Sequence, residues 1–517
     1  MEVPDGLTLT GCIAALVVTY YFGLFGYRLL LHPLCKYPGP LLAKVTDGYG
    51  GLYALKRELH SRTWKDHQRF GPVIRHGPNK LVFSSLQAVR DIYLNEGISK
   101  SLCYEAGNVN PTTTNVFNTI DKRTHRFKRK LVGQIVTDRS IRTFESKLSD
   151  HVDIFLAQIQ RDIESPINMS ERCKYLGLDI AAYLGFGYAL NLQTDPTYRY
   201  LVRAMMIGSW RLNLYMQFPF LRKLRLEILF YLLAVIQGKS FLKTLSMMIQ
   251  SRLAKEKKAE HDLYAFMAEA LDAPQEDRIT ASEIWTEGIF FLPAAGDTTS
   301  TTLSALFYYL ARNPQCRHKL AAEIRSSFPS AAEIGGSRLT GCRYLRACIN
   351  ESLRMSPPVP GTMWRQQLGS DSDQPLTVDG HVIPPGTSVG VDIYALHHNP
   401  QYFPNPFTYD PERWLLPKTD VSEAGSAPNA DDDAEASASE PRGLILNPAF
   451  IPFSLGARGC AGKALAYAEV SMAMARTLWS FDFEFADAKA VHAPEFRLWD
   501  VFTSSHDGPY LKFTPRS

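Results

Sequence analysis

Paired cysteines, a strong net charge and internal repeats are all missing from this chain of 517 residues. Its eight cysteines are scattered without a C-x-x-C pair, which argues against a disulfide framework or a zinc site and favours a reducing compartment. The formal net charge of +4 is too small to suggest a general nucleic-acid binder. A hydrophobic fraction of 45% with 21% charged residues instead indicates a chain that folds around a large core.

Charged side chains are also absent from a run near the N-terminus. Residues 7–27 carry none, and 21 residues are enough to cross a bilayer core of ~30 Å as a helix. Glu2 and Asp5 precede the run, whereas Arg28, His32 and Lys36 follow it, so the positive-inside rule places the bulk of the chain in the cytosol. We therefore predict a membrane anchor over 1–31, spanning at about 7–27; a buried core helix is the alternative.

Three prolines fall within HPLCKYPGP at 32–40, which cannot continue a helix and stiffens the chain. We predict a proline-rich hinge over 32–45, although a plain linker has the same composition. Residues 46–517 are expected to form one unit, mainly α with small β-sheets, including two early strands near 73–74 and 81–83. The segment 417–442 is rich in Asp, Glu, Ser and Ala and is predicted to be a disordered insertion. An acidic docking segment is the alternative for it.

One cysteine stands in a distinctive setting. Cys460 lies in the stretch FSLGARGCAG at 453–462, just before an alanine-rich helical pattern that starts near Ala461. The free N–H groups of a helix start and the charge of Arg458 would both favour the thiolate form of Cys460. Such a thiolate can be a nucleophile, a redox centre or a metal ligand, and a buried structural cysteine is the alternative.

Two polar residues interrupt a predicted long helix over about 282–312. Asp297 and Thr298 lie at its middle, within AAGDTT at 294–299, although both residue types prefer caps and turns. A hydrogen bond from the Thr298 hydroxyl back to the carbonyl of Ala294 would explain the threonine without any function. Pro293, just before this stretch, is expected to kink the helix.

Charged motifs flank that helix on both sides. The sequence E-x-x-R at Glu351 and Arg354 is followed downstream by PERW, which contains Arg413. An i,i+3 ion pair alone is common on surface helices and indicates little. Upstream, residues 121–130 hold six basic side chains, and His125 and Arg129 share one helix face. A solvated helix face or a nucleic-acid patch is the alternative for this run.

Together these motifs resemble the cytochrome P450 family, whose signature F-x-x-G-x-R-x-C-x-G matches the residues around Cys460. The wording HPL…YPGP is similar to that of membrane-anchored filamentous-fungal members. The resemblance implies the cytochrome P450 fold and a haem-thiolate monooxygenase that binds haem b, iron protoporphyrin IX. Cys460 would then be the axial ligand of the haem iron, and its sulfur would push electron density onto the iron.

The resemblance also implies roles for the other motif residues. Asp297 and Thr298 would open a groove over the haem and pass protons to bound oxygen, with Ala295 departing from the usual glycine. The buried charges of Glu351, Arg354 and Arg413 would brace the cysteine loop. The remaining residues would contact the haem: Arg458, His125, Arg129 and Arg365 at its propionates, Phe453 near the sulfur, and Gly456 and Gly462 where the backbone approaches the ring and the following helix. A surface arginine is the alternative for Arg365.

The family's chemistry sets the expected partners. One oxygen atom from O2 would enter a lipophilic small molecule by hydroxylation or epoxidation, in fungal secondary-metabolite biosynthesis. Electrons would come from NADPH through a separate NADPH-cytochrome P450 reductase, because no nucleotide fingerprint is evident in the 57 residues after Cys460. The expected location is the endoplasmic reticulum membrane, with the catalytic unit facing the cytosol and no nucleic-acid partner. An oxygen-independent isomerase or dehydratase, against which Thr298 argues, and a non-catalytic haem sensor are the alternatives.

Substrate contacts are expected in five stretches, and redox-partner contacts on one helix. By analogy with the family, the substrate would meet residues 103–117, 205–218, 289–295 and 359–363, and the region of Phe502. These stretches are rich in Met and aromatic residues, which suits a lipophilic ligand. A basic stripe of Lys122, Arg126 and Lys130 would steer an acidic redox partner.

Overall fold

The chain is described here by a computed structural model, which covers residues 6–108, 113–224, 232, 241–256, 262–271, 274, 278–368, 375–416, 443–487 and 493–516. The predicted insertion at 417–442 lies outside the described residues. Helices dominate, as predicted: α1 Gly6–Leu30, α2 Leu41–Val45, α3 Gly48–Leu55, α4 Leu59–Phe70, α5 Leu86–Tyr93, α6 Lys122–Ile135, α7 Asp138–Arg161, α8 Met169–Phe186, α9 Tyr200–Gln217, α10 Phe220–Lys223, α12 Phe241–Leu253, α13 Leu263–Leu271, α14 Ala281–Arg312, α15 Pro314–Ser327, α16 Gly336–Thr340, α17 Arg343–Met355, α18 Ile393–His397 and α19 Lys463–Ser480.

Four small sheets accompany these helices. The largest has the strand order β1-β2-β8-β5-β3, and only its β2–β8 pair is parallel. A second sheet has the order β4-β12-β9, and β6–β7 and β10–β11 are two-stranded. The two strands predicted early in the chain are confirmed as β1 and β2. The bounds are β1 Val73–Gly77, β2 Lys80–Phe83, β3 Ser99–Lys100, β4 Ile167–Asn168, β5 Arg365–Gln366, β6 Leu376–Val378, β7 His381–Ile383, β8 Ser388–Val391, β9 Phe481–Phe485, β10 Trp499–Val501, β11 Thr503–Ser505 and β12 Tyr510–Pro515.

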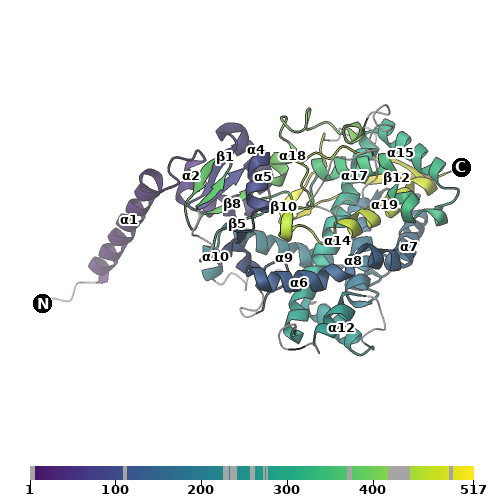
Figure 1. Cartoon of the computed structure of the whole chain (residues 1–517), viewed down its shortest axis with the longest axis horizontal. Coiled ribbons are helices and arrows are strands. Elements are labelled where there is room, and N and C mark those ends of the chain that lie inside the picture. The colour runs from purple at the N-terminus through teal and green to yellow at the C-terminus, as the bar shows by residue number, and fades with distance from the viewer. Residues whose placement is uncertain are drawn as a thin grey trace.

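Helix α1 projects away from the body of the protein, and the largest sheet lies between it and the helical part (Figure 1). Residues Thr10–Leu30 are long and apolar enough to cross a membrane, and none of this helix is buried in the rest of the protein. The proline-rich segment that follows is packed rather than free, because Leu34 and Tyr37 are buried against the sheet. The Arg75 side chain of β1 also donates to the carbonyl of Arg28, 2.8 Å away. The direction in which α1 leaves the body is therefore fixed by buried contacts.

Helix α14 is the longest helix of the described chain, and it runs through the main hydrophobic core. It begins with a capping box, in which Thr280 and Glu283 each bond the other's backbone N–H. Pro293 lies inside the helix without ending it. The hydroxyls of the central threonines are satisfied locally; Thr298 donates to the carbonyl of Ala294 at 2.7 Å. The predicted extent of the helix is confirmed.

The backbones of α8 and α14 touch at a pair of glycines. A Cβ added to Gly177 would lie 2.7 Å from the carbonyl oxygen of Gly296, and one added to Gly296 would lie 2.7 Å from Leu178 Cδ2. A glycine at 296 is therefore explained by helix packing, whichever residue stands at 295. This crossing sets the depth at which the following residue, Asp297, sits in the core.

We predict that Gly177→Ala lowers the free energy of unfolding by about 1–3 kcal/mol, because the added methyl must push two helix backbones apart. Chemical denaturation of the purified protein measures this. Gly208→Ala is the matched control: Gly208 lies inside α9, is exposed, and an added Cβ meets no atom within 4 Å. There the change should stabilise by about 0.5–1 kcal/mol through helix propensity alone. Equal effects of the two substitutions would contradict the close crossing.

Candidate functional site

The loop before α19 presents Cys460 in a tightly turned backbone. The Cys460 N–H donates to the carbonyl of Phe453 at 2.8 Å, and a short 3-10 turn, Gly456–Arg458, precedes it. Gly456 has φ +67°, and a Cβ there would collide with the carbonyl oxygen of Tyr93, so only glycine fits. At Gly462, φ is −85° and an added Cβ meets no protein atom within 4 Å. Packing against the following helix therefore does not require glycine at 462, and its predicted approach to the haem ring stays a prediction.

The charge environment of Cys460 differs from the one predicted. The Cys460 side chain is exposed, but the protein around the loop still desolvates the thiol and raises its pKa, and the Gly462 N–H and the Arg129 guanidinium oppose this rise. Arg458 does not supply the stabilising charge, because its side chain points to the backbone before α6, donating to the carbonyls of Thr119 at 2.6 Å and Ile120 at 2.9 Å. The structure therefore places Arg129 rather than Arg458 near the thiol, and stabilisation of the thiolate by the helix start stays a prediction. Bonding to a metal cation would supply the missing stabilisation.

Five basic side chains converge beside this loop from four separate segments. Arg365 is buried on β5, and its partner in the sheet register is Lys100 of β3, also buried. His125 and Arg129 come from α6, and Arg458 from the cysteine loop. The surface alternative for Arg365 is therefore excluded. Lys100 was missed because no motif marks it and only strand pairing brings it here.

These basic groups repel one another. The pKa of Arg458 falls to about 10 through burial and the nearby Arg365. Burial, followed by Arg458 and Lys100, lowers the pKa of His125 to about 3. Within the described residues, none of Arg129, Arg365, Arg458 and Lys100 forms an ion pair with a carboxylate. A buried group of like charges is costly unless a ligand supplies anions.

The residues present fit a haem. Its two propionates would supply the carboxylates that the basic cluster lacks, and Cys460 is a ligand that iron accepts. Arginine side chains also tie the cysteine loop to α6, because Arg129 donates to the carbonyl of Gly459 at 2.7 Å. The basic cluster and the Cys460 thiol therefore form one continuous site. The individual propionate roles of His125, Arg129, Arg365 and Arg458 stay predictions.

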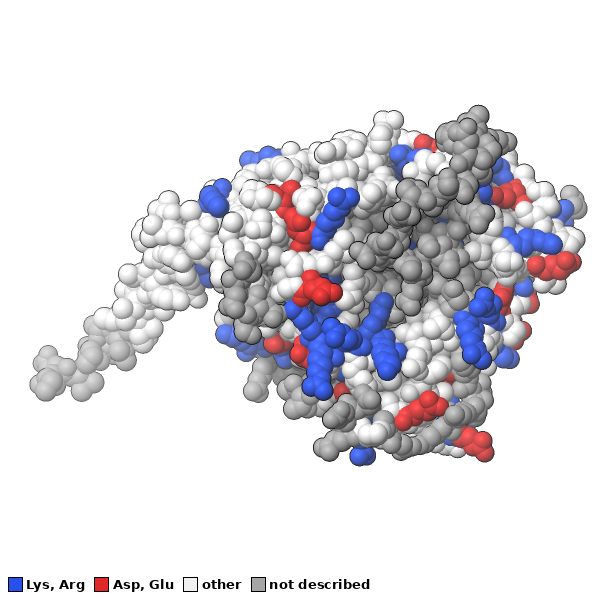
Figure 2. All heavy atoms as spheres, in the orientation of Figure 1, with Lys and Arg blue, Asp and Glu red and all other residues white. Residues whose placement is uncertain are grey.

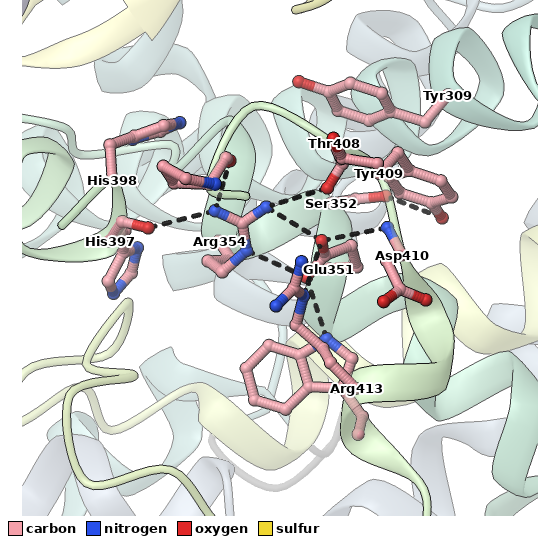
Figure 3. A network of polar contacts seen from close by, with 12 residues as sticks. Tyr309, Glu351, Ser352, Arg354, His397, His398, Thr408, Tyr409, Asp410 and Arg413 are labelled. Carbon is pink, nitrogen blue, oxygen red and sulfur yellow. Dashed lines mark hydrogen bonds and ion pairs between the residues drawn. The ribbon is translucent and has the colours of Figure 1, made fainter. Parts of the chain in front are cut away.

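The Glu351 carboxylate is the centre of a buried polar network (Figure 3). It accepts two hydrogen bonds from Arg354, at 2.8 and 2.9 Å, and one from Arg413 Nε at 3.1 Å. The Trp414 indole N–H, at 2.9 Å, and the Asp410 N–H, at 3.1 Å, complete its shell. Burial alone would raise the pKa of Glu351, but the two arginines hold it below its usual value. The three charged residues predicted to meet do so.

Arg354 extends this network toward the cysteine loop. Its Nη1 donates to the carbonyls of His397, at 3.0 Å, and Pro406, at 2.7 Å. The His397 ring accepts the backbone N–H of Ile451 at 3.1 Å. Ile451 lies two residues before Phe453, so a chain of buried hydrogen bonds connects α17 with the start of the cysteine loop. Bracing of that loop is thus geometrically supported.

Asp297 and Thr298 lie side by side on α14, and both are only half-buried. Burial nevertheless raises the pKa of Asp297 to about 7, and Lys174 on α8 partly opposes the rise. A carboxyl group with such a pKa exists in both protonation states near neutrality, which suits a group that passes protons on. Thr298 keeps a local hydrogen bond, as noted above, and its predicted role stays a prediction.

Aromatic rings from three of the predicted substrate-contacting stretches meet one another. Phe117 stacks on Phe290 of α14, with ring centroids 4.9 Å apart, and lies edge-on to Phe502 at 5.2 Å. The Lys100 Nζ lies 4.3 Å from the Phe117 ring centroid, so this group of rings adjoins the basic cluster. We call Phe117, Phe290 and Phe502 the aromatic wall. All three are half-buried, as expected for rings that face a ligand.

Basic side chains also gather on the outer surface where α6 lies (Figure 2). Arg126 and Lys130 are exposed there and Lys122 is half-buried. Lys128, by contrast, points inward and pairs with Glu283 at 2.9 Å and Glu287 at 3.3 Å. The exposed part of the run is available to a partner, whereas Lys128 is structural.

Comparison with known proteins agrees with this geometry. The family model described as Cytochrome P450 matches residues 38–513. The chain is 34% identical over 504 residues to cytochrome P450 monooxygenase poxM of Penicillium oxalicum, covering 96% of this chain and 92% of that protein. It is 32% identical to monooxygenase atnE of Emericella nidulans, with 97% and 96% covered, and 30% identical to apf7 of Gibberella fujikuroi, with 95% of each covered.

We predict that Arg354→Ala destabilises the protein by about 3–5 kcal/mol, because it leaves the Glu351 carboxylate buried without its main partner. The variant should also fail to retain haem, which absorbance per mole of protein measures. Arg161→Ala is the control, since the exposed Arg161 side chain pairs with Asp162 at 2.8 Å. Such an exposed pair should contribute little to the stability. A normal haem content in Arg354→Ala would refute the bracing role.

Proposed function

Because the chain belongs to the cytochrome P450 family of haem-dependent monooxygenases, we propose that it inserts one atom of O2 into a lipophilic small molecule of fungal secondary metabolism. The reaction would be a hydroxylation or an epoxidation. The proposal rests on one observation: Cys460 lies next to the buried basic cluster. A cofactor that contains both a metal and carboxylates would bind to both. The aromatic wall beside it supports a lipophilic substrate.

Each group of residues in the site would have its own role. Haem, when bound, would supply the oxygen-activating iron, and the Cys460 sulfur would hold that iron. Arg129, Arg365 and Arg458 would orient the cofactor by pairing with its propionates, with His125 and Lys100 beside them. Glu351, Arg354 and Arg413 would hold the cysteine loop in place, with Phe453 and Gly456 shaping the turn and Gly462 next to the ring.

Proton supply would fall to α14. The Asp297 carboxyl would take up a proton and release it toward the site, and the Thr298 hydroxyl beside it would help to hand it on. A carboxyl group with a pKa of about 7 suits both directions of transfer.

The same proposal includes a place in the cell and a source of electrons. Residues 1–31 would anchor the protein in the endoplasmic reticulum membrane, 32–45 would orient it, and 46–517 would form the catalytic domain on the cytosolic side. Electrons would come from NADPH through a separate cytochrome P450 reductase, which the exposed basic residues of α6 would attract. The composition of α1, the packed segment after it and the basic surface support these points.

We expect the reduced, CO-bound protein to show the long-wavelength absorption band of thiolate-ligated haem, because Cys460 ligates the iron. Cys460→Ser should lose this band. Cys35 is a half-buried cysteine near the N-terminus, distant in sequence from Cys460, and Cys35→Ser should keep the band. Absence of the band from folded, haem-replete wild-type protein would end the proposal. Oxygen uptake that requires both NADPH and reductase would then separate a monooxygenase from an isomerase or a haem sensor.

We further predict that Asp297→Asn slows product formation about 100-fold, because an amide cannot release and regain the proton. The fraction of consumed O2 that appears as hydrogen peroxide should rise at the same time. Ser300→Ala is the control on the same helix, since the Ser300 hydroxyl only donates to the carbonyl of Asp297 at 2.9 Å. Unchanged coupling of O2 consumption to product in Asp297→Asn would show that another group supplies the protons. Comparing metabolites of the host with and without the gene would identify the substrate.

A further inference from the structure

The turn between β10 and β11 holds a bulky residue in an unfavourable backbone conformation. Phe502 has φ +85°, in the region that favours glycine and is costly for an aromatic residue. The two strands pair directly on either side of it, Val501 with Thr503. Such a conformation persists only where the surroundings enforce it, and it tends to occur at functional sites. The contacts around Phe502 must therefore stabilise this conformation.

One buried carboxylate enforces this turn. Asp500, on β10, is almost fully buried and accepts the Phe502 N–H at 3.1 Å. Its other oxygen accepts the His60 N–H at 3.2 Å, and its own N–H donates to the carbonyl of Arg57 at 2.8 Å. Asp500 thus fixes the Phe502 turn against the start of α4.

The same carboxylate also holds helix α9. Asn213 is buried on α9, and its Nδ2 donates to Asp500 Oδ1 at 3.0 Å. The oxygen that positions Phe502 is therefore the one that receives the α9 side chain. The Asn213 Nδ2 group also donates to the Asp500 backbone carbonyl at 3.5 Å, so a displacement of α9 and a displacement of the Phe502 ring are coupled through Asp500.

The opposite ring of the aromatic wall is held in a comparable way. The Val116 N–H, next to Phe117, donates to the buried Glu287 of α14 at 3.0 Å. Asn115 Nδ2 donates to the carbonyl of Thr286 at 3.2 Å. Two of the three rings are thus placed by buried carboxylates, whereas Phe290 is placed by α14 itself.

We propose that the aromatic wall binds a planar, unsaturated part of the substrate, and that Asp500 is the positioning residue that sets Phe502 and links it to α9 through Asn213. Stacked and edge-on rings accept a further flat ring readily, which favours this substrate class over a branched aliphatic one. The inference rests on the proposed function, because it concerns ligands bound next to the haem.

The test uses two ligands that bind haem iron through the same nitrogen: imidazole, and 4-phenylimidazole, which adds one flat ring. Spectral titration of the full-length holoprotein gives both affinities. Phe502→Leu should weaken 4-phenylimidazole about tenfold, a loss of about 1.4 kcal/mol, and change imidazole less than twofold. Asn213→Ala should act in the same direction, whereas Ser209→Ala, at a half-buried polar side chain one turn earlier on α9, should not.

The double variant separates positioning from general damage. If Asn213 acts through Phe502, Asn213→Ala should cause no further loss of 4-phenylimidazole affinity in the Phe502→Leu background. Additive losses, an equal loss for imidazole, or no effect of Phe502→Leu would each overturn the inference. The CO-bound spectrum is recorded first for every protein. If the wild type shows the thiolate band and the azole affinities do not change, only this inference fails; if the band is missing, the proposed function fails with it.

Discussion

The Glu351 carboxylate is the constraint on which the arrangement of the site depends. A buried anion is tolerated only when every lone pair is satisfied, and here two arginines, an indole and a backbone N–H from two distant segments must arrive together. Helix α17 and the PERW turn are thereby locked to each other, and Arg354 carries the constraint on to the carbonyls of His397 and Pro406. These fixed segments hold the neighbouring cysteine loop in place, although the loop itself is rich in glycine.

The basic cluster needs negative charges that a bound ligand, rather than the polypeptide, would supply. Three arginines, a lysine whose pKa is lowered by burial and by those arginines, and a histidine that burial and its neighbours keep neutral lie beside Cys460. Among the described residues, none of the three arginines forms an ion pair with a carboxylate. The charge of this site is consequently complementary to that of an anionic, metal-containing ligand. Haem binding and folding of this region are expected to be coupled for that reason.

Much of this could be predicted from the sequence, because motifs with fixed spacing encode local geometry. Helix α14 follows from its helical pattern, whereas the meeting of Glu351, Arg354 and Arg413 follows from the resemblance of their motifs to the family. What could not be predicted depends on pairing between distant segments. Lys100 joins the basic cluster only because β3 lies beside β5, and the side-chain direction of Arg458 follows from the position of α6. That Arg129 rather than Arg458 lies near the Cys460 thiol depends on the same arrangement of distant segments. Membrane insertion, domain limits and the individual haem contacts remain predictions.

The contact between Gly177 and Gly296 has a consequence for how such a chain can diversify. It pins the half of α14 that carries Asp297 to α8 by backbone contact, so the register of Asp297 does not depend on which side chains precede it. Side chains among residues 289–295 can therefore be exchanged without moving Asp297 along or around the helix axis. Loss of either glycine would instead force the two helix backbones apart and displace Asp297 with them.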